Sequence, residues 1–416
     1  MLALLVICLT ASSVMSQASA PIQITILSNF TPDVSRGKIF NEIIDTFNQE
    51  YAGEIEVISN PDPDWPTLQQ KIRSLIAAGT PADVFLYNYN GNDLSREESG
   101  LLMDWTPYLD ADPEWKARFH PENLEALTVN GEIVGIPSDQ APVLFYYHKD
   151  LFEQAGIDTF PTTWDEFFAD ADALKASGVA PIALMTSDDA WHAMNAFTYL
   201  AAGLGGKDVF AVGQSLDTPA VMDAADQLKR MFEYTTSDAV GANYSVSSAN
   251  FLNKNAAMII DGPWLISSIQ GQVEDPCNVG VAVAPTFGDD TIPAGFVVTD
   301  SLNPWGAAKQ SDPAREEAVV EWMKFLTSED NVKKISVEGE YPMAISTTFT
   351  EDDLAQANCQ MAQVLQLSNA ASVTVVEAVR NIKPSAQAQL PSLLEGLALD
   401  QLSPADFTNQ LQQYNQ

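Results

Sequence analysis

Aromatic side chains occupy unusual positions in this sequence, because many of them adjoin polar or turn-forming residues instead of apolar runs. They fall in predicted loops or at the ends of predicted elements: Phe30, Trp65, Tyr87, Tyr89, Trp191, Trp264, Trp305 and Tyr341. A flat apolar ring stacks on the C–H face of a sugar, and side-chain amides and carboxylates hydrogen-bond the sugar hydroxyls. The alternative is that each ring covers the core of its own domain. Taken as a set, the rings favour a surface for a polar, ring-shaped ligand.

Other kinds of chemistry find less support in the residue pattern. The three histidines, His120, His148 and His192, show no metal-binding spacing such as H-x-x-x-H. The sequence contains no G-x-S-x-G, no phosphate-binding G-x-x-x-x-G-K and no G-x-G-x-x-G. We therefore expect no metal and no cofactor.

Paired carboxylates are harder to exclude, because the chain has 56 Asp and Glu residues. A glycosidase needs two of them, and only the fold decides which two meet. Asp139, Asp261 and Asp300 are the carboxylates nearest to predicted strand ends. Nothing in the sequence pairs them, so a glycosidase stays an open alternative.

Length and charge narrow the class of protein. The chain has 416 residues, of which 46% are hydrophobic, and this favours two ordinary domains. The formal net charge is −36, from 20 Lys and Arg against 56 Asp and Glu. Such a surface repels a phosphate backbone, so nucleic acid is excluded as a partner, and the acidity indicates a solubilising surface.

The first twenty residues resemble a signal peptide. They carry no charge, contain an apolar run, and end in Ala18-Ser19-Ala20, which has the form of a signal-peptidase site. The alternative is a buried N-terminal strand. Residues 1–20 therefore predict a periplasmic or secreted protein. After their removal only Cys277 and Cys359 remain, and an even pair in an exported protein favours a disulfide over two separate thiols.

Strand and helix patterns alternate along the N-terminal part of the chain. Ile22, Ile24 and Ile26 have the period of a strand, residues 36–51 carry one apolar helical face, and residues 55–58 form a second strand. A helix near residues 64–78 and a strand at 83–87 complete the pattern. This order is typical of βαβ units in a parallel sheet, in which ligands lie beyond the carboxyl ends of the strands.

A second alternation begins after an abrupt polar break at Ser138-Asp139-Gln140. An apolar strand covers residues 143–147, and Thr163-Trp164-Asp165-Glu166 is a capping box that opens a helix. We interpret the polar break as a crossover between two lobes, and the space between lobes is a common place for a ligand.

Several segments together resemble the extracellular solute-binding proteins of bacterial ABC transporters, in the branch that takes sugars and includes maltose-binding protein. The segments that carry the resemblance are GEIVGIP (131–137), YYHKDLF (146–152), FPTTWDE (160–166), NAAM (255–258) with GPW (262–264), the helix over 313–328 and the loop GEYP (339–342). The resemblance covers essentially the whole mature chain.

The resemblance implies an α/β type II periplasmic-binding-protein fold. Each lobe would be a mostly parallel sheet flanked by helices, with a ligand cleft at a multi-strand hinge. The implied domains are residues 21–140 with 284–328 for the first lobe and 141–283 with 329–416 for the second. This division places both cysteines in the same lobe.

Sugar contacts are expected from the loops that match those of the family, and from the aromatic set above. The expected ligand-binding residues are Asn29, Phe30, Trp65, Tyr87, Asn88, Asn90, Asp139, Gln140, Trp191, His192, Trp264, Trp305 and Tyr341. Trp264 has the strongest motif, because GPW is matched in full.

The resemblance implies a secreted receptor of an ABC importer that binds a mono- or oligosaccharide and delivers it to the membrane permease by hinge closure. It would act as a monomer, without a chemical step. The alternatives are a same-fold receptor for another polar solute, such as a polyamine, glycerol phosphate or iron, and a secreted glycoside hydrolase. A polyamine site needs clustered carboxylates, and a phosphate site needs Arg or Lys.

Overall fold

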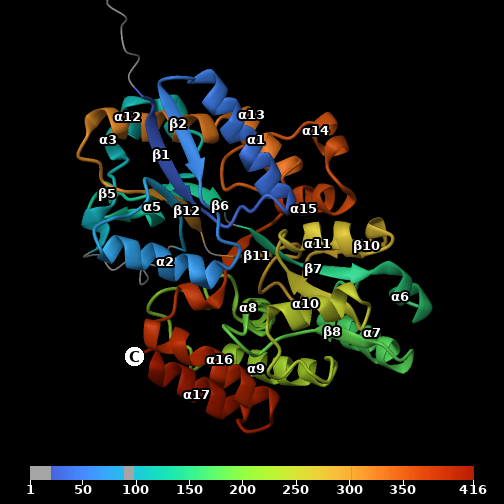
Figure 1. Cartoon of the computed structure of the whole chain (residues 1–416). Helices are drawn as coiled ribbons and strands as arrows, with labels where there is room; N and C mark the ends of the chain where they lie inside the picture. Colours follow the sequence, from blue (N-terminus) through green and yellow to red (C-terminus); the bar gives the residue numbers. More distant parts are fainter. Residues whose placement is uncertain (1–19, 89–97, 140, 301) are drawn as a thin grey trace, which may run out of the picture.

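The protein folds into two lobes, each built on its own β-sheet (Figure 1). The structure is a computed structural model that describes residues 20–88, 98–139, 141–300 and 302–416. The predicted signal peptide, apart from Ala20, lies outside these residues. In Figure 1 the first lobe carries the blue N-terminal elements, and the second carries the green and yellow middle of the chain with the last red helices.

The first lobe contains a five-stranded sheet in the order β2-β1-β3-β12-β6. β1 pairs in parallel with β2 and with β3, whereas β12 runs antiparallel to β3 and β6. The strands are β1 (Ile22–Leu27), β2 (Ile55–Ser59), β3 (Val84–Leu86), β6 (Ile136–Asp139) and β12 (Asn303–Ala307). The strand–helix–strand–helix–strand order predicted for the N-terminal part is confirmed.

Helices cover this sheet because their apolar residues recur at helical spacing. The buried face of α1 includes Phe40, Ile43 and Phe47, and α12 presents Val319, Trp322 and Met323 to the same core. The remaining elements of the lobe surround them: α1 (Ser35–Glu50), α2 (Trp65–Ala77), η1 (Glu98–Leu101), α3 (Thr106–Ala111), α4 (Pro113–Lys116), α5 (Pro121–Ala126), the hairpin β4 (Thr128–Val129) and β5 (Glu132–Ile133), α12 (Pro313–Leu326) and α13 (Glu329–Val337).

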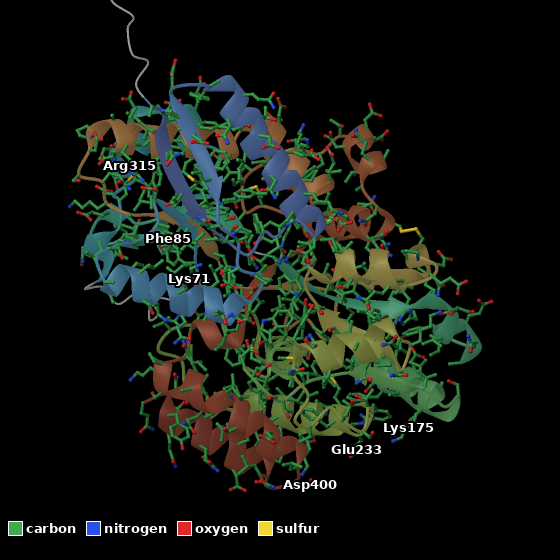
Figure 2. All side chains as sticks on the ribbon, viewed as in Figure 1. Lys71, Phe85, Lys175, Glu233, Arg315 and Asp400 are labelled. Carbon is green, nitrogen blue, oxygen red and sulfur yellow. A yellow bond between two sulfur atoms is a disulfide. The ribbon has the colours of Figure 1, made fainter. Side chains whose placement is uncertain are left out.

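An ion pair fixes α12 to the start of β3. The Asp83 carboxylate accepts hydrogen bonds from Arg315 Nε at 2.6 Å and Nη2 at 2.7 Å (Figure 2), and from the Thr25 backbone N–H at 2.8 Å. Burial raises the pKa of Asp83, but the hydrogen bonds from Arg315 and Thr25 outweigh it and hold the pKa below its usual value. Asp83 and Arg315 are far apart in the sequence, so the pair connects the N-terminal segment of the first lobe to the segment that returns to it after residue 300.

The second lobe contains a six-stranded sheet in the order β13-β11-β7-β9-β8, with β10 also paired to β7. β7 runs antiparallel to β9, β10 and β11, whereas β8 pairs in parallel with β9, and β13 with β11. The strands are β7 (Pro142–His148), β8 (Ala180–Ala183), β9 (Ala256–Asp261), β10 (Val279–Ala282), β11 (Val297–Thr299) and β13 (Thr374–Val376).

The helices of the second lobe enclose this sheet and its apolar core (Figure 1). The capping box predicted at Thr163 and Glu166 is present at the start of α7. The helices are α6 (Lys149–Gln154), α7 (Trp164–Ala176), α8 (Trp191–Gly205), α9 (Pro219–Phe232), α10 (Tyr244–Leu252), α11 (Leu265–Gln272), η2 (Pro276–Asn278), α14 (Glu351–Gln356), α15 (Cys359–Asn369), η3 (Ala378–Arg380), α16 (Pro384–Ala398) and α17 (Pro404–Tyr414).

The chain passes between the lobes three times. The second and third crossings lie later in the sequence than the predicted domain boundaries. The first crossing, from β6 of the first sheet to β7 of the second, lies between Asp139 and Pro142. The second lies between β11 and β12 instead of at residue 284, because β10 and β11 both pair with β7 in the second sheet. The third follows Ile345 instead of residue 328, because α13 and the loop after it pack in the core of the first lobe.

The predicted disulfide between Cys277 and Cys359 is present in the second lobe (Figure 2). It joins η2 to the first residue of α15, with 5.6 Å between the two Cα atoms and a sequence separation of 82 between the cysteines. The nearby His148, at the end of β7, is wholly buried and stacks on Phe251 at 4.4 Å between ring centroids. Burial lowers the pKa of His148, and its Nε2 lies 2.8 Å from the Phe251 carbonyl oxygen.

Candidate functional site

Polar side chains from both lobes meet at the ends of strands. Asp139 is the last residue of β6 and Asp261 the last residue of β9, while Asp300 directly follows β11 and Glu377 directly follows β13. Asp139, Asp261 and Glu377 are at most 2% exposed, so these carboxylates are shielded from bulk water. Strand ends are the usual ligand position in open α/β sheets. We call these four carboxylates, with Arg36 and Arg380, the polar junction.

Asp139 supplies the carboxylate of the first lobe. Its Oδ2 accepts a hydrogen bond from Asn303 Nδ2 at 3.0 Å, and the Tyr341 hydroxyl faces the same carboxylate. Burial raises the pKa of Asp139 to about 7; hydrogen bonding by Tyr341 and Asn303 opposes that rise, and the charge of Asp300 adds to it. A carboxyl group whose pKa is close to neutral pH can accept hydrogen bonds from ligand hydroxyls or donate one to them.

Asp261 supplies the corresponding carboxylate of the second lobe and is fully buried. Its Oδ1 accepts the Gly262 backbone N–H at 2.7 Å, and its Oδ2 lies 3.6 Å from His192 Nε2. Within the described residues, Asp261 Oδ2 and His192 Nε2 form no hydrogen bond, although the other ring nitrogen of His192 lies 2.9 Å from Ser247 Oγ. Buried polar atoms normally form hydrogen bonds, so these two atoms, which face each other, are candidate contacts for ligand polar groups.

Glu377 and Arg380 form a hydrogen-bonded pair at the edge of the second sheet. Arg380 Nε donates to Glu377 Oε1 at 2.7 Å, and Arg380 Nη2 lies 3.8 Å from Asp300 Oδ1. Burial and the charge of Asp300 raise the pKa of Glu377 to about 8, although Arg380 opposes this. The other oxygen of Glu377 accepts the indole N–H of Trp191 at 3.2 Å.

Arg36 extends between two aromatic rings of the first lobe. Its guanidinium carbon lies 5.6 Å from the Phe30 ring centroid and 5.5 Å from that of Tyr341. Its Nε is buried and forms no hydrogen bond to the described residues. Gly37 makes this position possible, because a Cβ there would lie 1.8 Å from the Thr31 carbonyl oxygen. The loop after β1 therefore packs tightly against the start of α1.

Two tryptophans of the second lobe present their rings to each other beside these charges. The Trp191 and Trp264 ring centroids are 5.3 Å apart, and both side chains are half-buried. The Trp264 ring folds over its own loop, where a Cβ on Gly262 would lie 2.4 Å from the ring. The GPW motif thus uses its glycine to make room for its tryptophan. Trp191 opens α8 after Ala190, whose φ of 54° is left-handed, and such strain is common at functional sites.

The structure places the other predicted ligand contacts in three groups. Phe30 and Trp305 are 2% and 1% exposed, and Trp305 stacks on Phe40 at 5.6 Å, so packing in the first lobe accounts for both rings. Tyr87 is buried and Trp65 half-buried in the apolar cluster beneath α2. Asn29 and Asn88 are half-buried at the ends of β1 and β3. Asn90 and Gln140, with Tyr89, lie outside the described residues.

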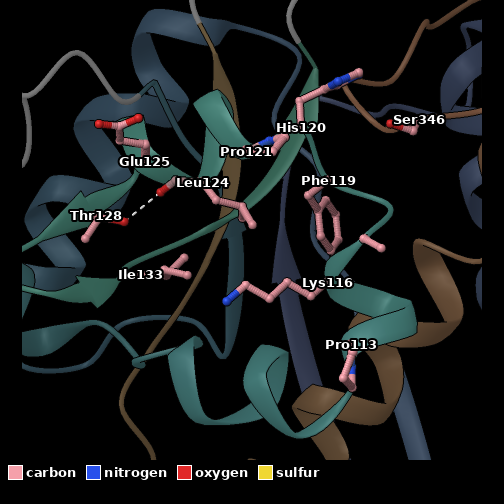
Figure 3. A pocket seen from close by; sticks show the side chains of 11 residues that line it. Pro113, Lys116, Phe119, His120, Pro121, Leu124, Glu125, Thr128, Ile133 and Ser346 are labelled. Carbon is pink, nitrogen blue, oxygen red and sulfur yellow. Dashed lines mark hydrogen bonds between the residues drawn. The ribbon is translucent and has the colours of Figure 1, made fainter.

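A separate pocket of about 670 Å³ lies on the first lobe, between α4, α5 and β5 (Figure 3). Its lining includes Phe119, Leu124 and Ile133, and none of its lining residues belongs to the polar junction. Its carboxylate, Glu125, is exposed. Because carboxylates oriented by burial are absent from this lining, we place the candidate site at the polar junction.

Metal binding and membrane insertion were also considered for the described part of the chain. There, no group of three or more His, Cys, Asp or Glu side chains is placed to hold a metal ion. Within the same residues, no helix is long and apolar enough to cross a bilayer.

Comparison with known proteins identifies the family of this chain. The model of the bacterial extracellular solute-binding proteins matches residues 31–333. The chain belongs to this family. An ABC transporter extracellular-binding protein of Pyrococcus horikoshii, whose function is uncharacterised, is 26% identical over 300 residues, which cover 69% of this chain and 64% of the relative.

Two further proteins resemble this solute-binding protein. The sn-glycerol-3-phosphate-binding periplasmic protein of Agrobacterium fabrum is 25% identical over 335 residues, covering 74% of this chain and 72% of the relative. A solved structure described as a chitin oligosaccharide binding protein superposes with a TM-score of 0.78 at 22% identity, covering 94% of this chain and 98% of the other. The latter shows that this solute-binding protein shares the two-lobed fold.

Sequence reasoning did not name Arg36, Tyr244, Glu377 or Arg380 as site residues of this solute-binding protein. Arg36 stands at the start of an amphipathic helix, where its place in the polar junction has no local signal. Glu377 and Arg380 follow a β-branched run, Val373–Val376, that a strand prediction could have used. Tyr244 faces Asp261 from α10, and burial raises its pKa well above the usual value, with that carboxylate adding to the rise.

Replacing Asp139 by Asn should stabilise this solute-binding protein at neutral pH. The folded-state pKa of about 7 lies above the usual 3.8. Between these pH values the unfolded chain loses the Asp139 proton while the folded protein keeps it, so the free energy of unfolding falls as pH rises. Asp139→Asn should raise the free energy of unfolding by roughly 1–2 kcal/mol at pH 7.5 and leave it unchanged near pH 4. Urea unfolding at both pH values measures this, and a less stable variant at pH 7.5 would contradict it.

Proposed function

We propose that this solute-binding protein is the secreted receptor of an ABC importer and that it binds a mono- or oligosaccharide between its lobes at the polar junction. The observation that carries this proposal is the pair of buried carboxylates, Asp139 in the first lobe and Asp261 in the second, together with the Trp191–Trp264 rings of the second lobe. Carboxylates accept hydroxyl hydrogen bonds and the rings offer an apolar face, which is the combination that a sugar requires.

The segments that cross between the lobes form the hinge through which the protein would deliver the sugar to the permease. The lobes are joined by three crossings, so closing them on a sugar and opening them at the permease is a rotation about short segments. The sugar stabilises the closed arrangement only through contacts that it makes with both lobes at once. We propose a monomer without a catalytic step, released to the periplasm or outside the cell by cleavage of residues 1–20.

A panel of ligands tests this proposal. Intrinsic fluorescence is suitable because all eight tryptophans lie after residue 20. The panel contains glucose, maltose, xylobiose and diacetylchitobiose with longer members of each series, together with spermidine and sn-glycerol 3-phosphate. Saturable shifts with a sugar support the proposal, whereas shifts with only spermidine or sn-glycerol 3-phosphate would overturn it. Chromatography of the incubated sugars tests for hydrolysis, which the proposal excludes.

Trp264→Ala should weaken binding of the sugar found in this panel about fivefold, because an aromatic contact contributes about 1 kcal/mol. Trp264→Phe keeps a ring at the same place and should retain most of the affinity. Isothermal titration calorimetry measures both variants. Equal affinity of Trp264→Ala and the wild type would assign this ring to packing alone.

A phosphorylated polyol is the second candidate ligand. The relative in Agrobacterium fabrum binds sn-glycerol 3-phosphate by name, and Arg36 has no ion pair within the described residues. The four carboxylates of the polar junction and the net charge of −36 oppose an anion there. We therefore favour the sugar, and the sn-glycerol 3-phosphate arm of the panel separates the two candidates.

A further inference from the structure

Among the hydrogen bonds between described residues that cross between the lobes, such as Ser267 to Glu340, one belongs to the polar junction. Arg380 Nη1 donates to Asn88 Oδ1 at 2.9 Å. Arg380 ends η3, which follows β13 of the second sheet, while Asn88 follows β3 of the first sheet. The bond can form only when the two lobes are close, so it belongs to the closed arrangement.

The guanidinium that makes this bond is held by a buried carboxylate. Glu377 is fully buried, and its Oε1 accepts from Arg380 Nε at 2.7 Å. Asp300 Oδ1 lies 3.8 Å from Arg380 Nη2 and adds a second negative charge at the edge of the same sheet. A planar guanidinium fixed on one edge directs its remaining N–H groups, so Glu377 aims Arg380 at the facing lobe.

The same carboxylate also holds an aromatic ring. Glu377 Oε2 accepts from Trp191 Nε1 at 3.2 Å, and the Trp191 ring lies 5.3 Å from that of Trp264. Hydrogen bonds therefore run without interruption from the ring proposed to face the sugar, through Glu377 and Arg380, to Asn88 of the other lobe.

We propose that Glu377 and Arg380 are positioning residues that couple the seating of a sugar against Trp191 to the latching of the lobes through Asn88. The inference rests on the proposed function, because the sugar is the group that reports through Trp191. A sugar that holds the ring keeps Glu377 in place, and this strengthens an Arg380–Asn88 bond that also forms, more weakly, without sugar. When the sugar leaves, the ring is free to shift and the latch weakens.

Asn88→Ala tests the latch without disturbing the buried pair, because it removes only the acceptor in the first lobe. Stopped-flow fluorescence with the tightest-binding sugar of the panel should show dissociation that is roughly tenfold faster, with association changed less than twofold. Asn88→Asp places a negative charge opposite Arg380 and should slow dissociation. Asn60→Ala, an exposed asparagine of the same lobe, should match the wild type.

Arg380→Gln in the Asn88→Ala background completes the comparison. If the two residues act through one bond, the second change should add little to the dissociation rate. Equal dissociation rates of Asn88→Ala and the wild type, or additive effects of the two substitutions, would overturn the latch.

A measurement without sugar separates failure of the latch from failure of the proposed function. Spin labels at exposed positions 71 and 223, one on each lobe, report the distance between lobes by pulsed electron spin resonance. Asn88→Ala should move the distribution toward longer distances, and an unchanged distribution would overturn the latch. If the wild type binds none of the sugars, the proposed function fails whatever the distances show.

Discussion

Replacing Asp261 by Asn should lower the affinity for the sugar identified in the panel about 100-fold, or close to 3 kcal/mol. The reason is the state of its Oδ2, which is fully buried and makes no hydrogen bond to the described residues. A sugar hydroxyl that donates to it would form a charge-assisted hydrogen bond away from water, and such bonds are about twice as strong as neutral ones. An amide at this position offers a weaker acceptor and a competing N–H group.

Isothermal titration calorimetry with the tightest-binding sugar measures the effect of Asp261→Asn. Asp223→Asn removes a carboxylate from the exposed face of α9 in the same lobe, and it should leave the affinity unchanged. Circular dichroism should show that both variants fold. An affinity within threefold of the wild type for Asp261→Asn would remove this carboxylate from the ligand contacts.

Removing the disulfide should reduce stability by about 4 kcal/mol, which is the largest effect on folding that we expect. Cys277 and Cys359 are separated by 82 residues, and on the chain-entropy model closing so long a loop restricts the unfolded chain strongly. The bridge ties η2 to the start of α15, and both belong to the second lobe. Its loss should therefore act on that lobe and leave the sugar contacts in place.

Urea unfolding of the Cys277→Ser, Cys359→Ser double variant measures this loss. Dithiothreitol provides the matched control, because it should destabilise the wild type by the same amount and leave the double variant unaffected. Sugar affinity at low denaturant should be equal for the two proteins. A difference in stability below about 1 kcal/mol would show that the reduced chain already holds these two segments together.

Local patterns were sufficient to predict much of this fold. The alternation of Ile22, Ile24 and Ile26 predicted β1, and Thr163 with Glu166 predicted the start of α7. Each of these signals is carried by residues that are close together in the sequence. The disulfide was predictable because the sequence has three cysteines, of which only two remain once the predicted signal peptide is set aside, and two cysteines have only one pairing.

Predictions that depend on contacts between distant residues were less complete. β11 and β13 have three residues each and become strands only through their sheet neighbours, β7 and β13 for β11, and β11 for β13. The crossing at 284 was therefore predicted too early. The crossing at 328 was also too early, because α13 and the loop after it pack in the core of the first lobe. Trp305 adjoins a proline and a glycine, which suggested a ligand contact, yet Phe40 covers it. The roles of Arg36 and Glu377 likewise arise only when separate strand ends converge.

The three crossings between the lobes have a consequence for the synthesis of the protein. The first sheet cannot be completed until β12 has been synthesised, and the second cannot be completed until β13 has, near residue 376. Strand pairing over such separations in sequence is slow, because long loops must close before any contact compensates for the lost entropy. The first sheet is therefore complete only after residue 307 of 416 has emerged, and the second only after residue 376. A nascent polypeptide with that property stays unfolded for most of its synthesis, and an unfolded chain is the form that a translocation channel can accept.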